Sequence, residues 1–94
     1  MERERIIHLR DEAHIGSTVM VCGWVRTFRN DTFIALNDGS CLDNLQLVID
    51  REATPDEVKR KITTGAAIQA TGLLKESQGR GQKTELEVQA LEIL

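Results

Sequence analysis

Hydrophobic and polar residues alternate along most of this 94-residue chain, and the alternation predicts a β-rich fold. The longest alternating run extends from Thr18 to Arg29, with Val19, Val21 and Val25 on its odd positions. Because successive side chains of a strand point to opposite faces, these valines share one face. We therefore expect one long strand whose valine face is buried in the core.

Shorter alternating runs predict four more strands, which are separated by turn residues. Arg29–Asp31 is predicted to form one turn. Asn37–Ser40 is predicted to form a second turn, because its Asp-Gly pair tolerates the positive φ that tight turns require. In the last strand the alternation places Leu86, Val88 and Ala90 together on one face. The expected ranges are 32–37, 45–50, 67–74 and 84–94, with a loop at 77–82.

One helix is predicted between the third and fourth strands. Thr54 is a suitable N-cap, Pro55 suits the first helical position, and Glu57 completes a capping box with Thr54. Basic residues near the end complement the helix dipole, and residues 63–65 end the helix. The first twelve residues mix charges of both signs with three aliphatic side chains, which favours a short helix or a lead-in strand.

Three strands, a short helix and two further strands are the order of elements in an OB-fold, a five-stranded Greek-key barrel. Gly23 and Gly72 lie inside predicted strands, where glycine indicates the bulges or bends that barrel closure needs. Other small barrels share this order of elements. The predicted fold class is therefore all-β, with residues 1–94 as one domain that has neither an internal repeat nor a dividing linker.

A planar ring and an amide are expected on the outer face of the second and third strands, through which OB-folds bind nucleic acids. If Ile34 and Leu36 face the barrel interior, Phe33 faces outward. If the leucines on either side of Gln46 face inward, that amide also points outward. The ring would offer a stacking platform for a base, and the amide a donor and an acceptor for its Watson–Crick edge. The alternative to this binding role is that Phe33 packs under a loop and that Gln46 is an ordinary solvated side chain.

The overall charge argues against a nucleic-acid partner, but its distribution does not. Twelve Lys and Arg residues stand against fifteen Asp and Glu, which gives a net charge of −3. Phosphate contacts need positive charge, so that figure alone ranks nucleic-acid binding low. Arg26 and Arg29, however, lie in a stretch from Ser17 to Asn30 that has no acid, and the loop around Arg80 is also locally basic. Each arginine alone would equally fit a solvated surface position.

No catalytic or metal-binding pattern occurs in the sequence. The pairs Cys22 and Cys41, and His8 and His14, lie at spacings that zinc motifs do not use. We expect Cys22 to be buried as a small apolar side chain, and both histidines to lie on the surface. No phosphate-binding loop or nucleophile motif is present, and no apolar run is long enough to span a membrane. The two thiols fit a reducing, cytoplasmic setting.

Five segments carry a family resemblance: Gly23–Thr27, Phe33–Cys41, Leu45–Ile49, Ile62–Gly65 and Leu73–Glu87. Together they resemble the N-terminal domain of asparaginyl-tRNA synthetase over roughly residues 17–94. The Gly-Trp-Val-Arg opening is shared with the aspartyl and partly with the lysyl enzymes of class II. The Asp-Gly-Ser-Cys turn and the Thr-Thr-Gly step favour the asparaginyl member.

The resemblance implies an OB-fold that binds the anticodon loop of tRNA(Asn). The residue that matches Phe33 stacks on the middle uridine of the anticodon, and the one that matches Gln46 hydrogen-bonds it. The matches of Arg26 and Arg29 are expected beside the anticodon loop, with Arg80 close by. No cofactor is implied for this domain. The parent enzyme would join asparagine to tRNA with ATP and Mg²⁺ as a cytoplasmic homodimer, whereas the isolated domain would be a monomer.

The sequence departs from that family in two respects. The family usually reads Arg-Thr-Arg-Arg where this chain has Arg26-Thr27-Phe28-Arg29, so a ring replaces one cation. The role of Phe28 stays open, and Trp24 is expected to be structural. The second departure is length, because no motif of the class II catalytic domain is present. We therefore expect a non-catalytic part of a longer synthetase.

Two other functions stay open at this point. One is a stand-alone OB-fold that binds single-stranded nucleic acid without sequence preference. The other is a protein-interaction domain, which the acidic balance and the scarcity of aromatic residues would suit.

Overall fold

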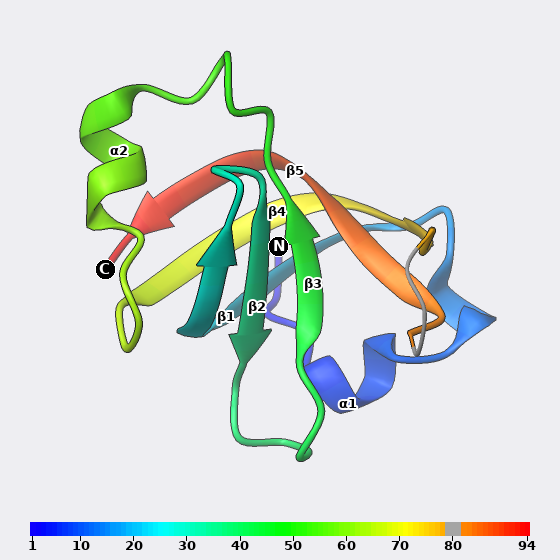
Figure 1. Ribbon diagram of the computed structural model, residues 1–94. Coiled ribbons are helices and arrows are strands. Elements are labelled where there is room, and N and C mark those ends of the chain that lie inside the picture. The colour runs from blue at the N-terminus through cyan, green and yellow to red at the C-terminus, as the bar shows by residue number, and fades with distance from the viewer. Residues whose placement is uncertain (79–81) are drawn as a thin grey trace.

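The five strands close into one barrel in the computed structural model, which describes residues 1–78 and 82–94 (Figure 1). Around the barrel the strand order is β1-β2-β3-β5-β4, with β4 paired again to β1. The β3–β5 pair is parallel and the other neighbours are antiparallel. The predicted OB-fold, with a helix between β3 and β4, is confirmed. The elements are α1 Ile6–Leu9, η1 Glu12–His14, β1 Thr18–Arg29, β2 Phe33–Asn37, β3 Leu45–Val48, α2 Asp56–Lys61, β4 Ala67–Glu76 and β5 Thr84–Ile93.

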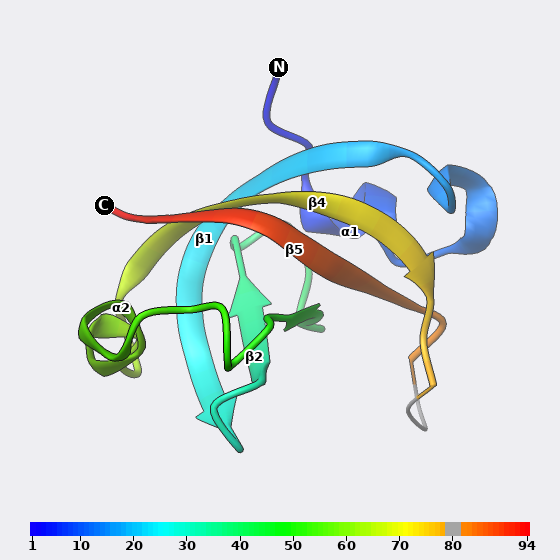
Figure 2. The same cartoon turned by 90° about the horizontal axis from the view of Figure 1, so that it is seen from above.

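Aliphatic side chains from all five strands fill the barrel, as the alternation predicts. The core includes the three β1 valines, and α1 adds Ile6 and Leu9, both fully buried. A hydrogen bond of 2.7 Å from the Thr84 hydroxyl to the Leu9 carbonyl oxygen ties α1 to the start of β5. The first residues therefore form a short helix that belongs to the core. Figure 2 shows β1, β4 and β5 curving together over one side of the molecule, with β2 across from them.

A bulge in β1 reverses which side chains point inward. Val25 pairs with Leu36, and Thr27 pairs with Ala35, so Arg26 is one extra residue on the β1 side. Beyond this bulge Phe28 pairs with buried Ile34 and packs against the core. The next residue, Arg29, then turns outward. The ring that replaces a cation of the family pattern is thus a packing residue.

A second bulge, in β5, also reverses which side chains point inward. Thr71 pairs with Ala90 and Gly72 with Val88, which leaves Gln89 as the extra residue. The prediction that Ala90 shares a face with Leu86 and Val88 is therefore wrong, and the Ala90 side chain is exposed. In its place Leu91 and Ile93 pack against the core.

Two glycines permit close backbone approaches inside the barrel wall. A Cβ at Gly23 would lie 2.4 Å from the carbonyl oxygen of Asn37. A Cβ at Gly72 would lie 2.1 Å from the carbonyl oxygen of Glu87, next to the β5 bulge. The predicted irregularity at Gly72 is confirmed, and its physical reason is backbone contact across the sheet.

The helix α2 begins without the predicted capping box. Pro55 is its N-cap and no side chain caps it, while the Thr54 hydroxyl donates a 2.7 Å hydrogen bond to the carbonyl oxygen of Asp50. Thr54 thus closes the turn before the helix and does not cap it. The acidic start and basic end do occur as predicted, and they complement the helix dipole.

Two predictions about single side chains have different outcomes. His8 and His14 are exposed, as expected. Cys22 is half-buried and not buried, because it lies on the β1 face opposite the valines, where its thiol is 3.7 Å from the Gln69 amide oxygen. No helix among the described residues is long and apolar enough to cross a membrane.

Candidate nucleic-acid interface

Phe33 and Gln46 lie on the outer face of the barrel, as their alternation with buried neighbours predicts. Both side chains are half-buried. Gln46 pairs with Ala35, and Phe33 pairs with Val48, so ring and amide are diagonal neighbours on one face. They share a hollow of about 530 Å³, whose lining residues are Arg29, Asn30, Phe33, Gln46, Gln78 and Glu85.

The β1–β2 turn places Arg29 beside the ring. Arg29 pairs directly with Phe33, an arrangement that exists because the bulge at Arg26 shifts the end of β1 by one residue. Asn30 and Asp31 have φ values of 55° and 51°, the left-handed conformation that a tight type I′ hairpin turn needs at both central residues. This turn is short, so it borders the hollow and leaves it open.

The remaining predicted arginines do not join this group. Arg26 is exposed but does not line the hollow, and its carbonyl oxygen accepts a 3.4 Å hydrogen bond from the Thr64 hydroxyl. Arg80 lies outside the described residues. The described structure therefore brings together Phe33, Gln46 and Arg29, while Arg26 stands apart.

Sequence reasoning missed three residues of the hollow, and of these Glu85 is buried whereas Asn30 and Gln78 are exposed. Glu85 is only 6% exposed, although it alternates with the buried Leu86 along β5. Its Oε1 atom is 3.4 Å from the Nε2 atom of Gln46 and 3.4 Å from the backbone nitrogen of Gln78. The parallel β3–β5 pairing sets Gln46 opposite Glu85. Knowledge of this pairing would have placed Glu85 in the hollow.

The basic character expected near the last loop is partly neutralised. The Lys75 ammonium is 2.8 Å from the Glu87 carboxylate. The hydrogen bond to that carboxylate is the largest influence on Lys75 and raises its pKa above the ordinary value. Lys75 therefore stays protonated but is already paired with an acid, so Arg29 is the described cation that lines the hollow.

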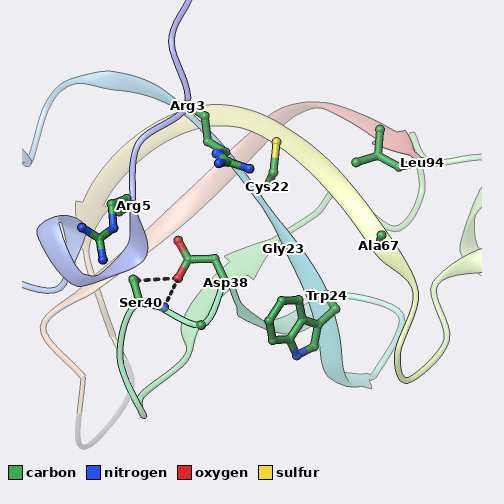
Figure 3. A pocket seen from close by; sticks show the side chains of 10 residues that line it. Arg3, Arg5, Cys22, Gly23, Trp24, Asp38, Ser40, Ala67 and Leu94 are labelled. Atoms are coloured by element: carbon green, nitrogen blue, oxygen red, sulfur yellow. Dashed lines mark hydrogen bonds between the residues drawn. The ribbon is translucent and has the colours of Figure 1, made fainter.

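A second hollow lies beside Trp24 and shares no residue with the first (Figure 3). Trp24 is 42% exposed and lies outside the core, and its expected structural role stays a prediction. Asp38 also lines this hollow, and its carboxylate accepts hydrogen bonds from the Ser40 hydroxyl at 2.5 Å and from the Ile6 backbone nitrogen at 2.9 Å. The Asp38 turn therefore anchors the start of α1.

We expect replacement of Asp38 by Asn to destabilise the protein in a pH-dependent way. Burial raises the pKa of Asp38, but hydrogen bonds from Ser40 and Ile6 outweigh it, so the folded-state pKa lies below the ordinary 3.8. A depressed pKa stabilises the folded protein above pH 3.8, and this contribution is lost as pH falls through the folded value.

Urea denaturation between pH 2 and 7 measures this effect. Wild type should exceed Asp38→Asn in stability near neutral pH, and the difference should shrink below about pH 4. Glu92→Gln, a change at an exposed acid of β5, is the control and should show a much smaller difference. A pH-independent difference for Asp38→Asn would contradict the assignment.

No group of three or more His, Cys, Asp or Glu side chains that could hold a metal ion occurs among residues 1–78 and 82–94. The residues described do not form a ligand set for Mg²⁺. The hollow is built for contacts of another kind, namely an aromatic face, an amide and one cation.

The barrel and its outer hollow define the class of protein, an OB-fold nucleic-acid-binding domain. In agreement, residues 19–94 match the family described as the OB-fold nucleic acid binding domain, and the chain belongs to this family. Its relatives include the asparagine–tRNA ligase of Parabacteroides distasonis, 44% identical over 96 residues, and that of Oleidesulfovibrio alaskensis, 37% identical over 97 residues. The resemblance inferred from the sequence is confirmed.

These matches cover nearly all of this chain but only part of each relative. The alignments include 99% and 100% of the chain, and 20% and 21% of the two ligases. Among solved structures, the asparaginyl-tRNA synthetase of Pyrococcus horikoshii matches the whole chain at a TM-score of 0.79 and 21% identity, covering 22% of that protein. An OBody bound to hen egg-white lysozyme matches at 0.80 and 17% identity, covering 94% of it. These two similarities concern the fold alone.

Proposed function

We propose that this chain is the anticodon-binding domain of an asparagine–tRNA ligase and binds the anticodon loop of tRNA(Asn). The observation that carries the proposal is the shared hollow of Phe33, Gln46 and Arg29, on the face that OB-folds use for nucleic acids. The identity of its relatives supports the choice of tRNA(Asn) over an arbitrary single strand.

Each side chain of the hollow has a distinct role in this proposal. The Phe33 ring stacks on the middle uridine of the anticodon. A base in a single-stranded loop can leave its neighbours and stack on an aromatic side chain in this way. Gln46 reads the Watson–Crick edge of that base, and Arg29 binds an adjacent phosphate. Arg26 and Arg80 are placed near the loop by the family resemblance only, and Arg26 lies outside the hollow.

The longer protein would carry out the chemistry. We propose that residues 1–94 form one domain of a cytoplasmic, homodimeric synthetase that joins asparagine to tRNA with ATP and Mg²⁺. The chain spans about a fifth of the length of its relatives, and it has no catalytic role in this scheme. As an isolated domain it would be monomeric and would position the tRNA.

A competition experiment tests this function against the alternatives. A labelled stem-loop with the asparagine anticodon is titrated with the protein at low salt, and unlabelled RNAs then compete. We expect the same stem-loop to compete well, and an unrelated single strand to compete at least ten-fold less well. Equal competition would favour a sequence-independent binder, and no binding of either RNA would favour a protein-interaction domain.

The two arginines of β1 should differ in their effect on RNA binding. Arg29→Gln should weaken stem-loop binding and reduce the slope of log affinity against log salt by about 0.7, the value for one contact to a single-stranded phosphate. Arg26→Gln removes the same charge outside the hollow, so it should change the slope less. Fluorescence anisotropy titrations at 50–200 mM salt measure both slopes. Equal slopes for the two variants would contradict the placement of Arg29 beside the phosphate.

A further inference from the structure

The hollow beside Trp24 exposes apolar side chains that the barrel itself does not cover. Its volume is about 400 Å³, and its walls come from the N-terminal segment, the middle of β1 and the end of β5 (Figure 3). Trp24 is 42% exposed and Leu94 is 66% exposed. A Cβ at Gly39 would lie 3.4 Å from the indole atom Cη2, so one edge of the ring rests on this turn. The rest of the ring is open and can act as an apolar anchor for a partner.

Two arginines without an acidic partner border the same hollow. Arg3 and Arg5 are exposed, and neither guanidinium lies within ion-pair distance of an acid in the part of the chain that the structure describes. Asp38 also lines the hollow, but its carboxylate accepts hydrogen bonds from its own turn and from the start of α1. The hollow therefore suits a segment that carries a carboxylate near an apolar side chain.

This hollow lies away from the face that we propose for RNA. Trp24 pairs with Asn37, the last residue of β2. Phe33 is the first residue of that strand, so the two hollows lie at opposite ends of β2. The Asp38 carboxylate would also repel a phosphate bound beside Trp24. A protein segment fits this hollow better than RNA does, and it would leave the Phe33 hollow free.

Leu94 places the continuation of the proposed ligase at this hollow. Its backbone nitrogen donates a 2.9 Å hydrogen bond to the Ala67 carbonyl oxygen, so pairing with β4 fixes the position of residue 94. The resemblance is to an N-terminal domain, and the chain spans about a fifth of the length of its relatives. In the proposed ligase, most of the protein therefore follows Leu94. Ten extended residues span roughly 33 Å, so a segment that begins at the edge of the hollow can cross it.

We propose that the segment directly after Leu94 in the ligase docks in this hollow. An apolar side chain of that segment covers Trp24, and a carboxylate pairs with Arg3 or Arg5. The inference rests on the proposed function, because it requires the longer protein. Docking fixes the direction in which the chain leaves the barrel, and it thereby orients the RNA-binding face relative to the rest of the ligase.

The rates at which the two cysteines are alkylated test this docking. Cys22 lines the hollow, whereas Cys41 is also half-buried but does not line it. Labelling with N-ethylmaleimide is followed by mass spectrometry in residues 1–94, in the same chain extended by about ten natural residues, and in the whole ligase. We expect Cys22 to react at least roughly ten-fold more slowly in both longer proteins than in residues 1–94. Cys41 should keep its rate within about two-fold, and equal protection of both thiols would overturn the inference.

Removal of positive charge should reverse the protection. In the extended chain, Arg3→Gln combined with Arg5→Gln should raise the Cys22 rate about five-fold, as expected for the loss of exposed ion pairs. The matched control is Arg51→Gln combined with Arg60→Gln, which removes the same charge from two exposed arginines outside the hollow. It should change the rate by less than about two-fold, and a thermal melt checks that each variant folds. If both double variants leave Cys22 equally protected, the pairing with a carboxylate is wrong.

Other results would overturn the inference by identifying a different occupant. Protection in the whole ligase but not in the extended chain would mean that a more distant part of the ligase covers the hollow. Protection in residues 1–94 that grows with protein concentration would indicate a second copy of the chain. Protection that appears only when the anticodon stem-loop is added would indicate RNA. Failure of all three proteins to bind that stem-loop refutes the proposed function, whatever the rate at Cys22.

A second measurement decides if Cys22 fails to react even in residues 1–94. Trp24 is the only tryptophan of the chain, so quenching of its fluorescence by acrylamide reports directly on the hollow. Any tryptophan in the extension is replaced by Phe. Quenching should be weaker in the extended chain than in residues 1–94, and equal quenching would overturn the inference.

Discussion

Replacing Phe33 by Ala should weaken binding of the asparagine anticodon stem-loop by about 5- to 150-fold. This range corresponds to the roughly 1–3 kcal/mol that stacking of one base on an aromatic side chain contributes. The ring is half-buried on the outer face, whereas its neighbour Ile34 is fully buried, so the barrel should fold without it. Isothermal titration calorimetry with the stem-loop measures the loss, and a thermal melt checks the fold.

A second substitution distinguishes stacking from general packing at this position. Phe33→Trp keeps a planar face and should bind within a few-fold of wild type. Phe33→Leu keeps an apolar side chain without a π-face and should resemble Phe33→Ala. If Phe33→Leu bound as well as wild type, the ring would serve as an apolar contact only, and the stacking role would be wrong.

Gly72→Ala is expected to have the largest effect on stability. The added Cβ would lie 2.1 Å from the Glu87 carbonyl oxygen and 2.8 Å from its carbonyl carbon, both of which are backbone atoms. Because no side chain can move aside to relieve this contact, β4 and β5 must separate. Overpacking of this kind costs about 3 kcal/mol, which lowers the Tm of a domain of this size by more than about 10 °C.

Gly16→Ala provides the comparison for this prediction. Gly16 has a φ of 95°, but a Cβ added there would meet no atom within 4 Å, so this change introduces backbone strain without a clash. It should cost about 1–2 kcal/mol. Urea denaturation curves of both variants give the two losses of stability. A loss for Gly72→Ala no greater than that for Gly16→Ala would show that the two strands accommodate the methyl group.

The two bulges explain why alternation predicted some side-chain orientations correctly and others not. Alternation located all five strands and oriented Phe33 and Gln46 correctly, because regular strands of period two lead into both residues. It could not detect one extra residue in a strand, since a bulge at Arg26 leaves the composition of β1 unchanged while reversing its faces. The inward turn of Phe28, the pairing of Arg29 with Phe33 and the exposure of Ala90 all follow from such extra residues.

Glu85 was missed for a different reason. Its partner Gln46 is 39 residues away in the chain, and the two meet only through the parallel β3–β5 pairing. Alternation within one strand reports which face a side chain occupies, but it does not report which strand lies beside it. A buried acid with a distant partner therefore has the same local pattern as a solvated one.

The parallel pairing also means that the hollow draws its wall from both halves of the chain. Phe33 and Gln46 lie on β2 and β3, which pair with each other directly. Glu85 joins them only because the last strand returns to lie beside β3 and complete the barrel. A chain without β5 would keep the ring and the amide on an open sheet but would lack this side of the hollow. The complete hollow is therefore a property of the closed barrel and not of the β2–β3 hairpin alone.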